Sequence, residues 1–405
     1  PPPPFPGPGA HLPLHPSRRR QRQMCIRDSE SAGRLTIVDQ VIAVNGATTV
    51  DNANLLGATT TGKLTATIAT TETVTELATL SADGGTNDLT IVIRAADATL
   101  STAAQLNTIN AATALAVDLT NVTALAGSSL SDLGTLATAI NANQFSNDTG
   151  LTTIALTDTT IDASTLASTI DSYDTINGGG TTGMTLASGA SINVDAGEIT
   201  EMLADESAGR LTIVDQVITV NSAATISVDT ANLLEATTTG VVTASITTTE
   251  TVSELNTLTG TTGAYTIVVA TGDATSTTAA ELNTLNGKTT VAVDLTNVTA
   301  LAGSSLSDLE TLASAINANE FSNDSGLTTI AVTDTTIDAT TLASTIDSYD
   351  AIGGTTDMTL ASGATINVDA GEITAMLADE SLGRLTIVDQ VLSLIHISEP
   401  TRRDQ

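Results

Sequence analysis

The strongest constraint on the fold is a long internal repeat. The string ESAGRLTIVDQV occupies residues 30–41 and returns unchanged at residues 206–217, which is 176 positions later. It returns once more, as ESLGRLTIVDQV, at residues 380–391. The sequence therefore predicts two long repeat units, at residues 30–205 and 206–379, followed by the start of a third unit at residues 380–391.

Each long unit divides again into shorter coils, and a period of 20–50 residues is typical of repeat arrays. The coils open with short runs rich in β-branched residues, such as LTIV from Leu35, LTATIA from Leu64 and TTIAL from Thr152. Alternation in these runs predicts strands with one apolar face. Segments with apolar residues three or four apart follow, which indicates short helices.

Several of these predicted helices begin with the residue pair of a capping box, S/T/D-x-x-E/Q. The pairs in the first unit are Thr73 with Glu76, Thr102 with Gln105, and Asp195 with Glu198. Their counterparts in the second unit are Thr251 with Glu254, Thr278 with Glu281, and Asp369 with Glu372.

One coil of strand, turn and short helix cannot bury its own apolar stripe, whereas coils stacked in parallel share a continuous core. Aromatic residues make up only 1% of the chain, and a narrow interior suits Leu, Ile, Val and Ala. The sequence therefore predicts an α/β repeat solenoid, in which each stacked coil contributes a short parallel β-strand plus a turn or a short helix. An all-β parallel β-helix is the alternative.

The two ends of the chain differ from the repeats in composition. All nine prolines, all three histidines and the only cysteine lie within residues 1–29 or 392–405. The runs RRQRQMCIRDS at 19–29 and LSLIHISEPTR at 392–402 resemble translated sequencing adapters. We therefore expect residues 1–29 to be a non-native, disordered Pro-rich segment and residues 392–405 to be a non-native tail. The part between them is then expected to be a metagenomic fragment of a longer protein.

Charge and residue type exclude several functions. The 405 residues include 45 acidic and 13 basic ones, a net charge of −32, which excludes electrostatic binding of nucleic acid. No run approaches the ~18 apolar residues of a membrane span. The repeats contain no His or Cys, so nucleophilic triads are excluded. We therefore expect no enzyme.

Repeated aspartates are the candidate metal ligands. They are Asp158, Asp162, Asp171 and Asp174, which recur as Asp334, Asp338, Asp347 and Asp350. Ca²⁺ prefers six to eight oxygen ligands, so these residues could bind calcium at the edge of the array. The alternative is turn and cap chemistry on a solvated acidic face, since no EF-hand loop is present. No other cofactor is expected.

Two other sets of residues repeat with the units. Arg34, Arg210 and Arg384 stand a few residues before Asp39, Asp215 and Asp389, which predicts a local ion pair or a cap that repeats with the fold. The aromatic residues that recur in both units are Phe145 with Phe321, and Tyr173 with Tyr349. Such rings either stack on sugars from the surface or plug gaps in the core. We expect the phenylalanines to be core residues, and both interpretations remain open for the tyrosines.

The segment LTTIALTDTTIDASTLASTI at 151–170 is similar to a leucine-rich repeat, except that Thr159 replaces the usual Asn or Cys. In overall style the repeats resemble large Thr/Ala/Asp-rich tandem-repeat, adhesin-like surface proteins of bacteria. This resemblance implies a non-catalytic structural or adhesive segment of a large secreted or cell-surface protein that continues into further repeats. Surface glycans or copies of the chain itself would be its partners. The alternatives are a ligand-binding solenoid for calcium or glycan and, more remotely, a β-helix enzyme acting on polysaccharides.

Overall fold

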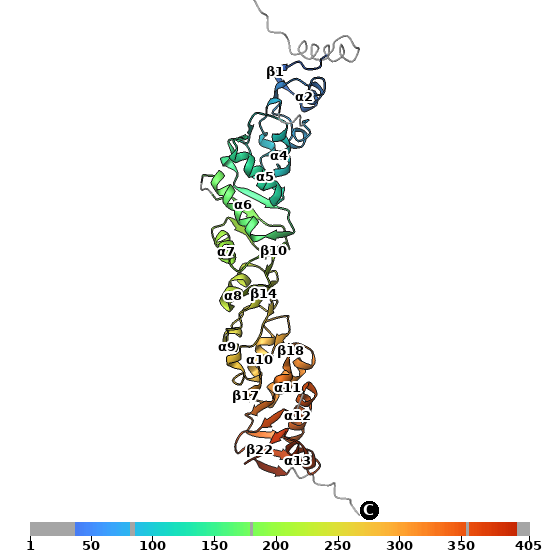
Figure 1. Cartoon of the computed structure of the whole chain (residues 1–405), viewed down its shortest axis with the longest axis vertical. Coiled ribbons are helices and arrows are strands. Elements are labelled where there is room, and N and C mark those ends of the chain that lie inside the picture. Colours follow the sequence, from blue (N-terminus) through green and yellow to red (C-terminus); the bar gives the residue numbers. More distant parts are fainter. Residues whose placement is uncertain (1–36, 82–85, 179–180, 354–355, 395–405) are drawn as a thin grey trace, which may run out of the picture. The chain divides into compact units, whose positions relative to one another are not determined.

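A computed structural model describes residues 37–81, 86–178, 181–353 and 356–394 (Figure 1). These residues form an α/β fold with 12 α-helices and many short strands in several sheets. The strand pairs with a recorded register are all parallel. The α/β prediction is confirmed, and the all-β alternative is wrong because the apolar stripes after the strands form α-helices.

The chain divides into two compact units. The first comprises the described residues up to 154 together with 172–182, and the second comprises 155–171 and the described residues from 183 onward. This division does not follow the sequence repeat, whose second copy begins at Glu206. The strand β7 (Thr153–Leu156) and the helix α6 (Ala163–Ile176) contain two of the three points where the division crosses the chain, and the third lies between residues 182 and 183.

The remaining elements of the first unit alternate between strands and helices. The strands are β1 (Ile42–Thr48), β2 (Leu64–Ile68), β3 (Asp88–Thr90), β4 (Val117–Asp118), β5 (Ala124–Ser128) and β6 (Phe145–Ser146). The helices are α2 (Val50–Gly57), α3 (Val74–Leu77), α4 (Ala103–Ala111) and α5 (Leu130–Asn141), with short 3₁₀ turns η1 (Ala95–Asp97) and η2 (Asp148–Gly150). The strands expected from Leu64 and Thr152 are β2 and β7, whereas Leu35 lies outside the described residues.

The second unit repeats this alternation over a longer stretch. Its strands are β8 (Thr160–Asp162), β9 (Gly183–Thr185), β10 (Ser191–Val194), β11 (Leu211–Thr212), β12 (Val217–Val220), β13 (Thr225–Ile226), β14 (Val242–Ile246), β15 (Ala264–Thr266), β16 (Val293–Asp294), β17 (Ala300–Ser304), β18 (Phe321–Ser322), β19 (Thr329–Val332), β20 (Thr336–Asp338), β21 (Asp357–Thr359), β22 (Thr365–Val368), β23 (Leu385–Thr386) and β24 (Val391–Leu394).

The helices of the second unit follow individual strands. They are α7 (Ile199–Ser207), α8 (Val228–Thr237), α9 (Val252–Leu255), α10 (Ala279–Asn286), α11 (Leu306–Asn317), α12 (Ala339–Gly353) and α13 (Ile373–Ser381), with 3₁₀ turns η3 (Thr271–Asp273) and η4 (Asp324–Gly326). Successive helices α10, α11 and α12 pack on one another (Figure 1).

Parallel strands from successive coils stack their apolar residues in register. In the sheet of order β13-β14-β12-β10-β8, Ile192 pairs with Ile161 on one side and with Ile218 on the other, and Ile218 pairs with Val242. All four side chains are fully buried. Each buried residue of this kind contributes about 1.5–3 kcal/mol, so the core is built as a row of similar layers.

The other sheets of the second unit use the same layering. In the order β17-β19-β21-β23, Ile330 pairs with Met358, and Met358 pairs with Leu385. A third sheet has the order β20-β22-β24. The predicted start of a third repeat, residues 380–391, supplies β23 and the beginning of β24. Of the segments expected to be non-native, residues 1–29 lie outside the described residues, and only Leu392–Leu394 of the tail lie inside them.

The capping-box predictions are correct at four of six sites. Full boxes begin α3, α4, α9 and α10, at Thr73, Thr102, Thr251 and Thr278. At Asp195 and Asp369 the prediction is wrong, because α7 and α13 begin later, at Ile199 and Ile373. There the glutamate accepts from the aspartate N–H but closes a turn that precedes the helix.

Candidate functional site

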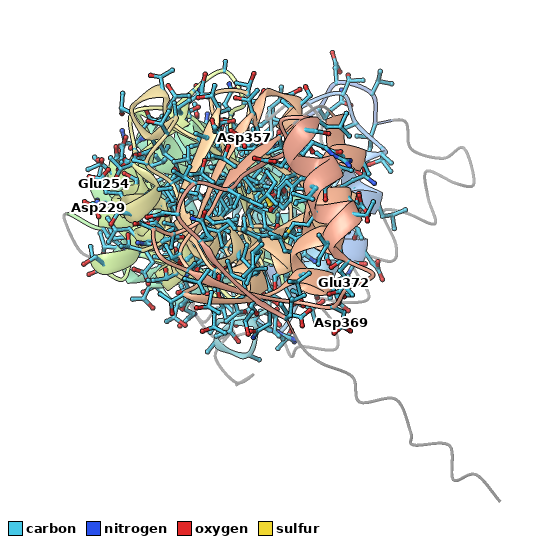
Figure 2. All side chains as sticks on the ribbon, turned by 90° about the horizontal axis from the view of Figure 1, so that it is seen from below. Asp229, Glu254, Asp357, Asp369 and Glu372 are labelled. Atoms are coloured by element: carbon cyan, nitrogen blue, oxygen red, sulfur yellow. The ribbon has the colours of Figure 1, made fainter. Side chains whose placement is uncertain are left out.

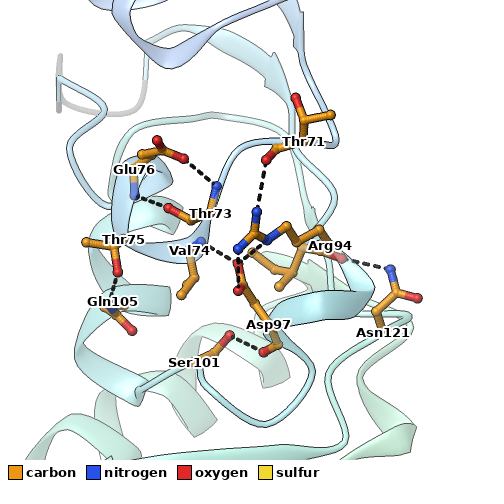
Figure 3. A network of polar contacts seen from close by, with 11 residues as sticks. Thr71, Thr73, Val74, Thr75, Glu76, Arg94, Asp97, Ser101, Gln105 and Asn121 are labelled. Atoms are coloured by element: carbon orange, nitrogen blue, oxygen red, sulfur yellow. Dashed lines mark hydrogen bonds and ion pairs between the residues drawn. The ribbon is translucent and has the colours of Figure 1, made fainter.

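The first amide of several helices is capped by a residue of the next coil. The Val74 N–H of α3 donates to Asp97 Oδ2 at 2.7 Å, while Thr73 and Glu76 of the same coil cap each other (Figure 3). An unpaired amide at a helix N-terminus carries partial positive charge, so a carboxylate there is stabilising. The helix is therefore completed by residues that follow it by more than 20 positions.

The same arrangement recurs along the chain. The acceptors lie 21 to 28 residues beyond the amides that they cap, and the pairs are Val228 with Glu250, Val252 with Asp273, Leu306 with Asp334, Ala103 with Ser128, and Ala279 with Ser304. Their donor–acceptor distances run from 2.8 to 3.2 Å. Neighbouring coils thus satisfy each other's polar backbone groups.

Asparagine side chains form a second link between neighbouring coils. Five side-chain amides donate to a backbone carbonyl 25 residues ahead, at 2.9 to 3.2 Å: Asn54 to Thr79, Asn107 to Asp132, Asn232 to Thr257, Asn256 to Glu281, and Asn283 to Asp308. The sequence reasoning missed these residues, although the recurring string Leu-Asn-Thr at Leu106, Leu255 and Leu282 was a usable signal.

Arginines anchor carboxylates at coil boundaries. Arg94 binds Asp97 through two hydrogen bonds, Nε to Oδ2 at 2.9 Å and Nη2 to Oδ1 at 3.0 Å, and donates to the Thr71 carbonyl (Figure 3). The Asp97 side chain is only 3% exposed. The buried side chain of Asp97 therefore joins a helix N-terminus to an arginine. The backbone carbonyl of the same residue accepts a hydrogen bond from the Ser101 hydroxyl.

A local ion pair does repeat with the fold, as predicted, but the arginine's partner is Asp205 or Asp379 and not the expected Asp215 or Asp389. Arg210 lies 2.5 Å from Asp205 and 3.8 Å from Asp171, and Arg384 contacts Asp379, Asp350 and Asp347. Burial raises the pKa of Asp379, although Arg384 acts against this. Arg34, with which the first unit was expected to form its pair, lies outside the described residues.

The aspartates expected to pair with these arginines bind other donors. Asp215 accepts from the Ser188 hydroxyl and the Gly189 N–H, and Asp389 accepts from Ser362 and Gly363. These hydrogen bonds lower the pKa of both carboxyl groups. A loop one coil away therefore outcompetes the arginine that is close in sequence.

The eight candidate calcium ligands have separate structural roles. Asp162 and Asp338 accept from the N–H groups of Thr165 and Thr341 in the first turns of α6 and α12. Hydrogen bonds from nearby hydroxyl and amide groups lower the pKa of both aspartates. Asp334 caps α11, and its counterpart Asp158 lies half-buried after β7.

The other four candidates lie on α6 and α12. Asp171 faces Arg210, Asp347 and Asp350 face Arg384, and Asp174 accepts weakly from the Thr182 N–H at 3.4 Å. Within the described ranges, no three acidic, His or Cys side chains converge to hold a metal ion. The arrangement therefore favours the cap-and-turn interpretation over a shared calcium site.

A polar hollow lies where β8, β10 and β12 end. Its lining is Asp162, Asn193, Val194, Asp195, Glu198, Thr219 and Asn221. The polar groups already bind one another, since Asn221 Nδ2 donates to Asp195 Oδ1 at 2.9 Å and Glu198 accepts from the Asp195 N–H at 3.0 Å. Asp369 and Glu372, the counterparts of Asp195 and Glu198 in the next unit, are labelled in Figure 2, and Glu372 accepts from the Asp369 N–H at 2.9 Å.

All aromatic rings in the described part of the chain are buried. Phe145 and Phe321 are core residues as predicted, and Tyr173, Tyr265 and Tyr349 are at most 2% exposed. The hydroxyls of Tyr173 and Tyr349 donate to the carbonyls of Leu133 and Leu309 inside α5 and α11, at 3.1 and 3.0 Å. The interpretation of the tyrosines as surface platforms for sugars is therefore wrong.

Two further findings bear on function. Among the described residues, no helix combines the length and the apolar character that crossing a membrane requires. Comparison of the sequence with protein-family models and with curated proteins gave no match.

Proposed function

We propose that this chain is a repeat solenoid that serves as a non-catalytic structural segment of a large secreted or cell-surface bacterial protein. The observation that carries the proposal is the capping of helix N-termini by the following coil. A coil with this design is complete only when its neighbour is present, as in solenoids whose stability is a sum over neighbouring repeats. Such a coil is suited to an array in which further coils follow.

The distribution of polar groups supports the same role. Carboxylates, asparagines and arginines are engaged in contacts within and between coils, and many of them have counterparts in the other unit, such as Asn107 with Asn283 and Arg210 with Arg384. An enzyme site is usually one asymmetric constellation, so a periodic set of this kind suits a scaffold better. Exposed carboxylates such as Asp229 and Glu254 (Figure 2) contribute to the net charge of −32, which keeps the protein soluble.

Small-angle scattering tests the proposed solenoid. A compact chain of this length has a radius of gyration of about 22 Å. A continuous stack of coils gives a clearly larger value, with a scattering profile typical of a rod. A radius of gyration near the compact value would overturn the solenoid.

Surface display tests the proposed function. The chain would be placed between a cell anchor and an epitope tag, and the height of the tag above the membrane would be compared with that in a variant lacking residues 206–379. A structural spacer gives a greater tag height for the longer chain. Equal heights would contradict this function.

The alternative is a ligand-binding solenoid, and the polar hollow at the ends of β8, β10 and β12 is the observation in its favour. If it binds calcium, millimolar Ca²⁺ raises the melting temperature of the protein, and mutation of both Asp162 and Asp195 to Asn abolishes the rise. If it binds a glycan, an array of bacterial and host sugars retains the chain. An unchanged melting temperature together with a silent array removes this alternative.

A further inference from the structure

The coil junctions at α3 and α9 are copies of each other that differ in one basic residue. In the first repeat, Arg94 lies just before η1 and contacts the carboxylate that caps α3 (Figure 3). The corresponding residue of the second repeat is Ala270, 176 positions later and just before η3. A guanidinium group that is present at one junction is therefore absent from the other.

The backbone at the two positions has the same conformation. Arg94 has φ −70° and ψ 152°, and Ala270 has φ −62° and ψ 148°. The aspartate three residues later, Asp97 or Asp273, donates its N–H to the carbonyl of this position at 3.0 Å in both copies. Its carboxylate also accepts from the first amide of the helix in both copies. The arginine is therefore missing from a junction that is otherwise built in the same way.

In the first repeat the guanidinium of Arg94 occupies a site with two kinds of acceptor. Its Nε and Nη2 donate to the two carboxylate oxygens of Asp97, and its Nη1 donates to the Thr71 carbonyl at 3.1 Å (Figure 3). A planar guanidinium fits a carboxylate with two parallel hydrogen bonds. The Arg94 side chain is 29% exposed, so this site is reached from solvent.

The second repeat keeps the acceptors of this site. Asp273 corresponds to Asp97, and Thr249 corresponds to Thr71. Asp273 is partly exposed, whereas Asp97 is buried beneath the guanidinium. In the part of the chain that the structure describes, the Asp273 carboxylate has one hydrogen-bond donor, the Val252 N–H. The acceptors are thus present without the cation that binds them in the first repeat.

The surrounding charges favour a cation more strongly in the second repeat. Gln105, whose amide donates to the Thr75 hydroxyl in the first network at 3.4 Å, is replaced by Glu281 (Figure 3). Glu254, the counterpart of Glu76, is exposed (Figure 2). One arginine is lost and one glutamate is gained, so the second junction is two charges more negative than the first.

We propose that the site formed by Asp273 and Thr249 binds an alkylguanidinium cation from outside the chain, namely the side chain of an arginine on a partner polypeptide. The bound guanidinium donates to the Asp273 carboxylate and the Thr249 carbonyl, as Arg94 does to its own acceptors. This inference goes beyond the proposed structural function, and it needs only one coil junction.

A guanidinium is the occupant that the first repeat itself holds at this place. A lysine ammonium is a compact charge that cannot form the two parallel hydrogen bonds to a carboxylate. Ca²⁺ prefers six to eight oxygen ligands, and no three acidic, His or Cys side chains converge within the described ranges. The chemistry of the site therefore selects arginine over lysine and over a metal ion.

Calorimetric titration of the full chain with N-acetylarginine methylamide tests the proposal. We expect saturable binding of one equivalent per chain. N-acetyllysine methylamide at the same ionic strength should bind about tenfold more weakly, because it lacks the second hydrogen bond of a charged pair. Ethylguanidinium is the probe for a small-molecule source of the same group.

Four variants locate the binding. Ala270→Arg supplies the guanidinium from within the chain, so it should abolish binding and raise the melting temperature. Arg94→Ala opens the first site and should raise the stoichiometry from one to two equivalents. Asp273→Asn should weaken binding about tenfold. Glu310→Gln, at an exposed acid on α11, is the matched control and should bind like the unmodified chain.

Three outcomes would overturn the proposal. Equal binding of the arginine and lysine probes would show a general attraction of cations to an acidic surface. Undiminished binding to folded Ala270→Arg would place the ligand elsewhere. Binding of ethylguanidinium without binding of the capped arginine would exclude a polypeptide partner. Circular dichroism verifies that each variant is folded, and Ala270→Arg decides the matter even if Arg94→Ala fails to fold.

Discussion

Tyr265 and Glu235 lie in different coils and form a hydrogen bond with each other. Both positions hold other residues in the first repeat. The Tyr265 hydroxyl donates to Glu235 Oε1 at 2.7 Å. The corresponding residues of the first repeat are Leu89 and Gly57, which have no such polar pair to form. The buried Tyr265 hydroxyl keeps its hydrogen bond only while Glu235 is present, so the two positions have to be substituted together.

We predict that Tyr265→Phe destabilises the protein by about 1–3 kcal/mol, because the hydrogen bond to a carboxylate is lost. Glu235→Gln should have a smaller effect in the Tyr265→Phe background than in the unmodified chain, since the two residues act as one unit. Urea denaturation of the two single variants and the double variant measures this coupling. Strictly additive effects would show that the contact contributes no stability.

The buried tyrosines also predict a loss of stability at alkaline pH. Burial raises the pKa of Tyr173 and Tyr349, and burial together with Glu235 raises the pKa of Tyr265. The folded protein then holds these protons at a pH where the unfolded chain releases them. Stability from this source is complete below about pH 10 and falls as the pH rises further.

Ultraviolet absorbance of tyrosinate checks this prediction when it is recorded together with circular dichroism during an alkaline titration. The two signals should change together, because ionisation accompanies unfolding. Tyrosinate absorbance that appears near pH 10 in a still-folded protein would contradict the burial of the hydroxyls.

At the scale of the element, six helices, α3, α4, α8, α9, α10 and α11, are capped both from their own coil and from the next one. The residues at N-cap and N3 lie within one turn, so their positions are visible in the sequence. The carboxylate that caps the first amide approaches from 21 to 28 residues away, and its position depends on the length of the coil between. Each of these six helix starts is thus a point where two coils are joined.

Asp97→Ala tests this joint. The substitution leaves the Val74 N–H and the Arg94 guanidinium without their buried acceptor, and we predict a loss of about 2–4 kcal/mol. Asp51→Ala, at an exposed acid in the first turn of α2, is the control and should cost less than about 0.5 kcal/mol. Thermal denaturation measures both, and equal losses would refute the special role of Asp97.

The asparagine bridge offers a comparison within the chain itself. Asn256 donates to the Glu281 carbonyl, whereas the corresponding residue of the first repeat is Ala78, which has no such group. We predict that Asn256→Ala destabilises the protein by about 1 kcal/mol, the value of one hydrogen bond. Denaturant titration of this variant measures the midpoint of unfolding. An unchanged midpoint would show that the hydrogen bond from Asn256 adds no stability.

At the scale of the whole molecule, the repeat allows one unit to be removed without a new junction. Deletion of residues 206–379 joins Asp205 to Glu380 and restores the local sequence MLADES. Because stability in repeat arrays is carried by neighbouring coils, we predict that the shortened chain remains folded with a similar melting temperature. Circular dichroism and thermal denaturation measure this outcome.

An out-of-phase deletion is the control for this prediction. Removal of residues 206–367 joins the end of α7 to the last residue of β22, so helix and strand no longer alternate correctly at the junction. This variant should lose cooperativity and stability. If the two deletions behaved alike, coil phase would not matter and the proposed stacking would be wrong.

The sequence by itself determined the features that depend on nearby residues. The α/β class, strands such as β2 and β7, and the capping boxes at Thr73 and Thr251 follow from patterns within about ten residues. The repeat length follows from the recurring string ESAGRLTIVDQV. Such patterns fail where a turn competes, as at Asp195 and Asp369, because the same Asp-x-x-Glu contact closes a turn and delays the helix.

Only the tertiary structure decided which residues meet across coils. Arg384 contacts Asp379, Asp350 and Asp347, although Asp389 is as close in sequence as Asp379. Asp389 is bound by Ser362 and Gly363 of the neighbouring coil. The physical reason is that a side chain pairs with whatever the stacking register brings beside it, and that register depends on the length of each coil.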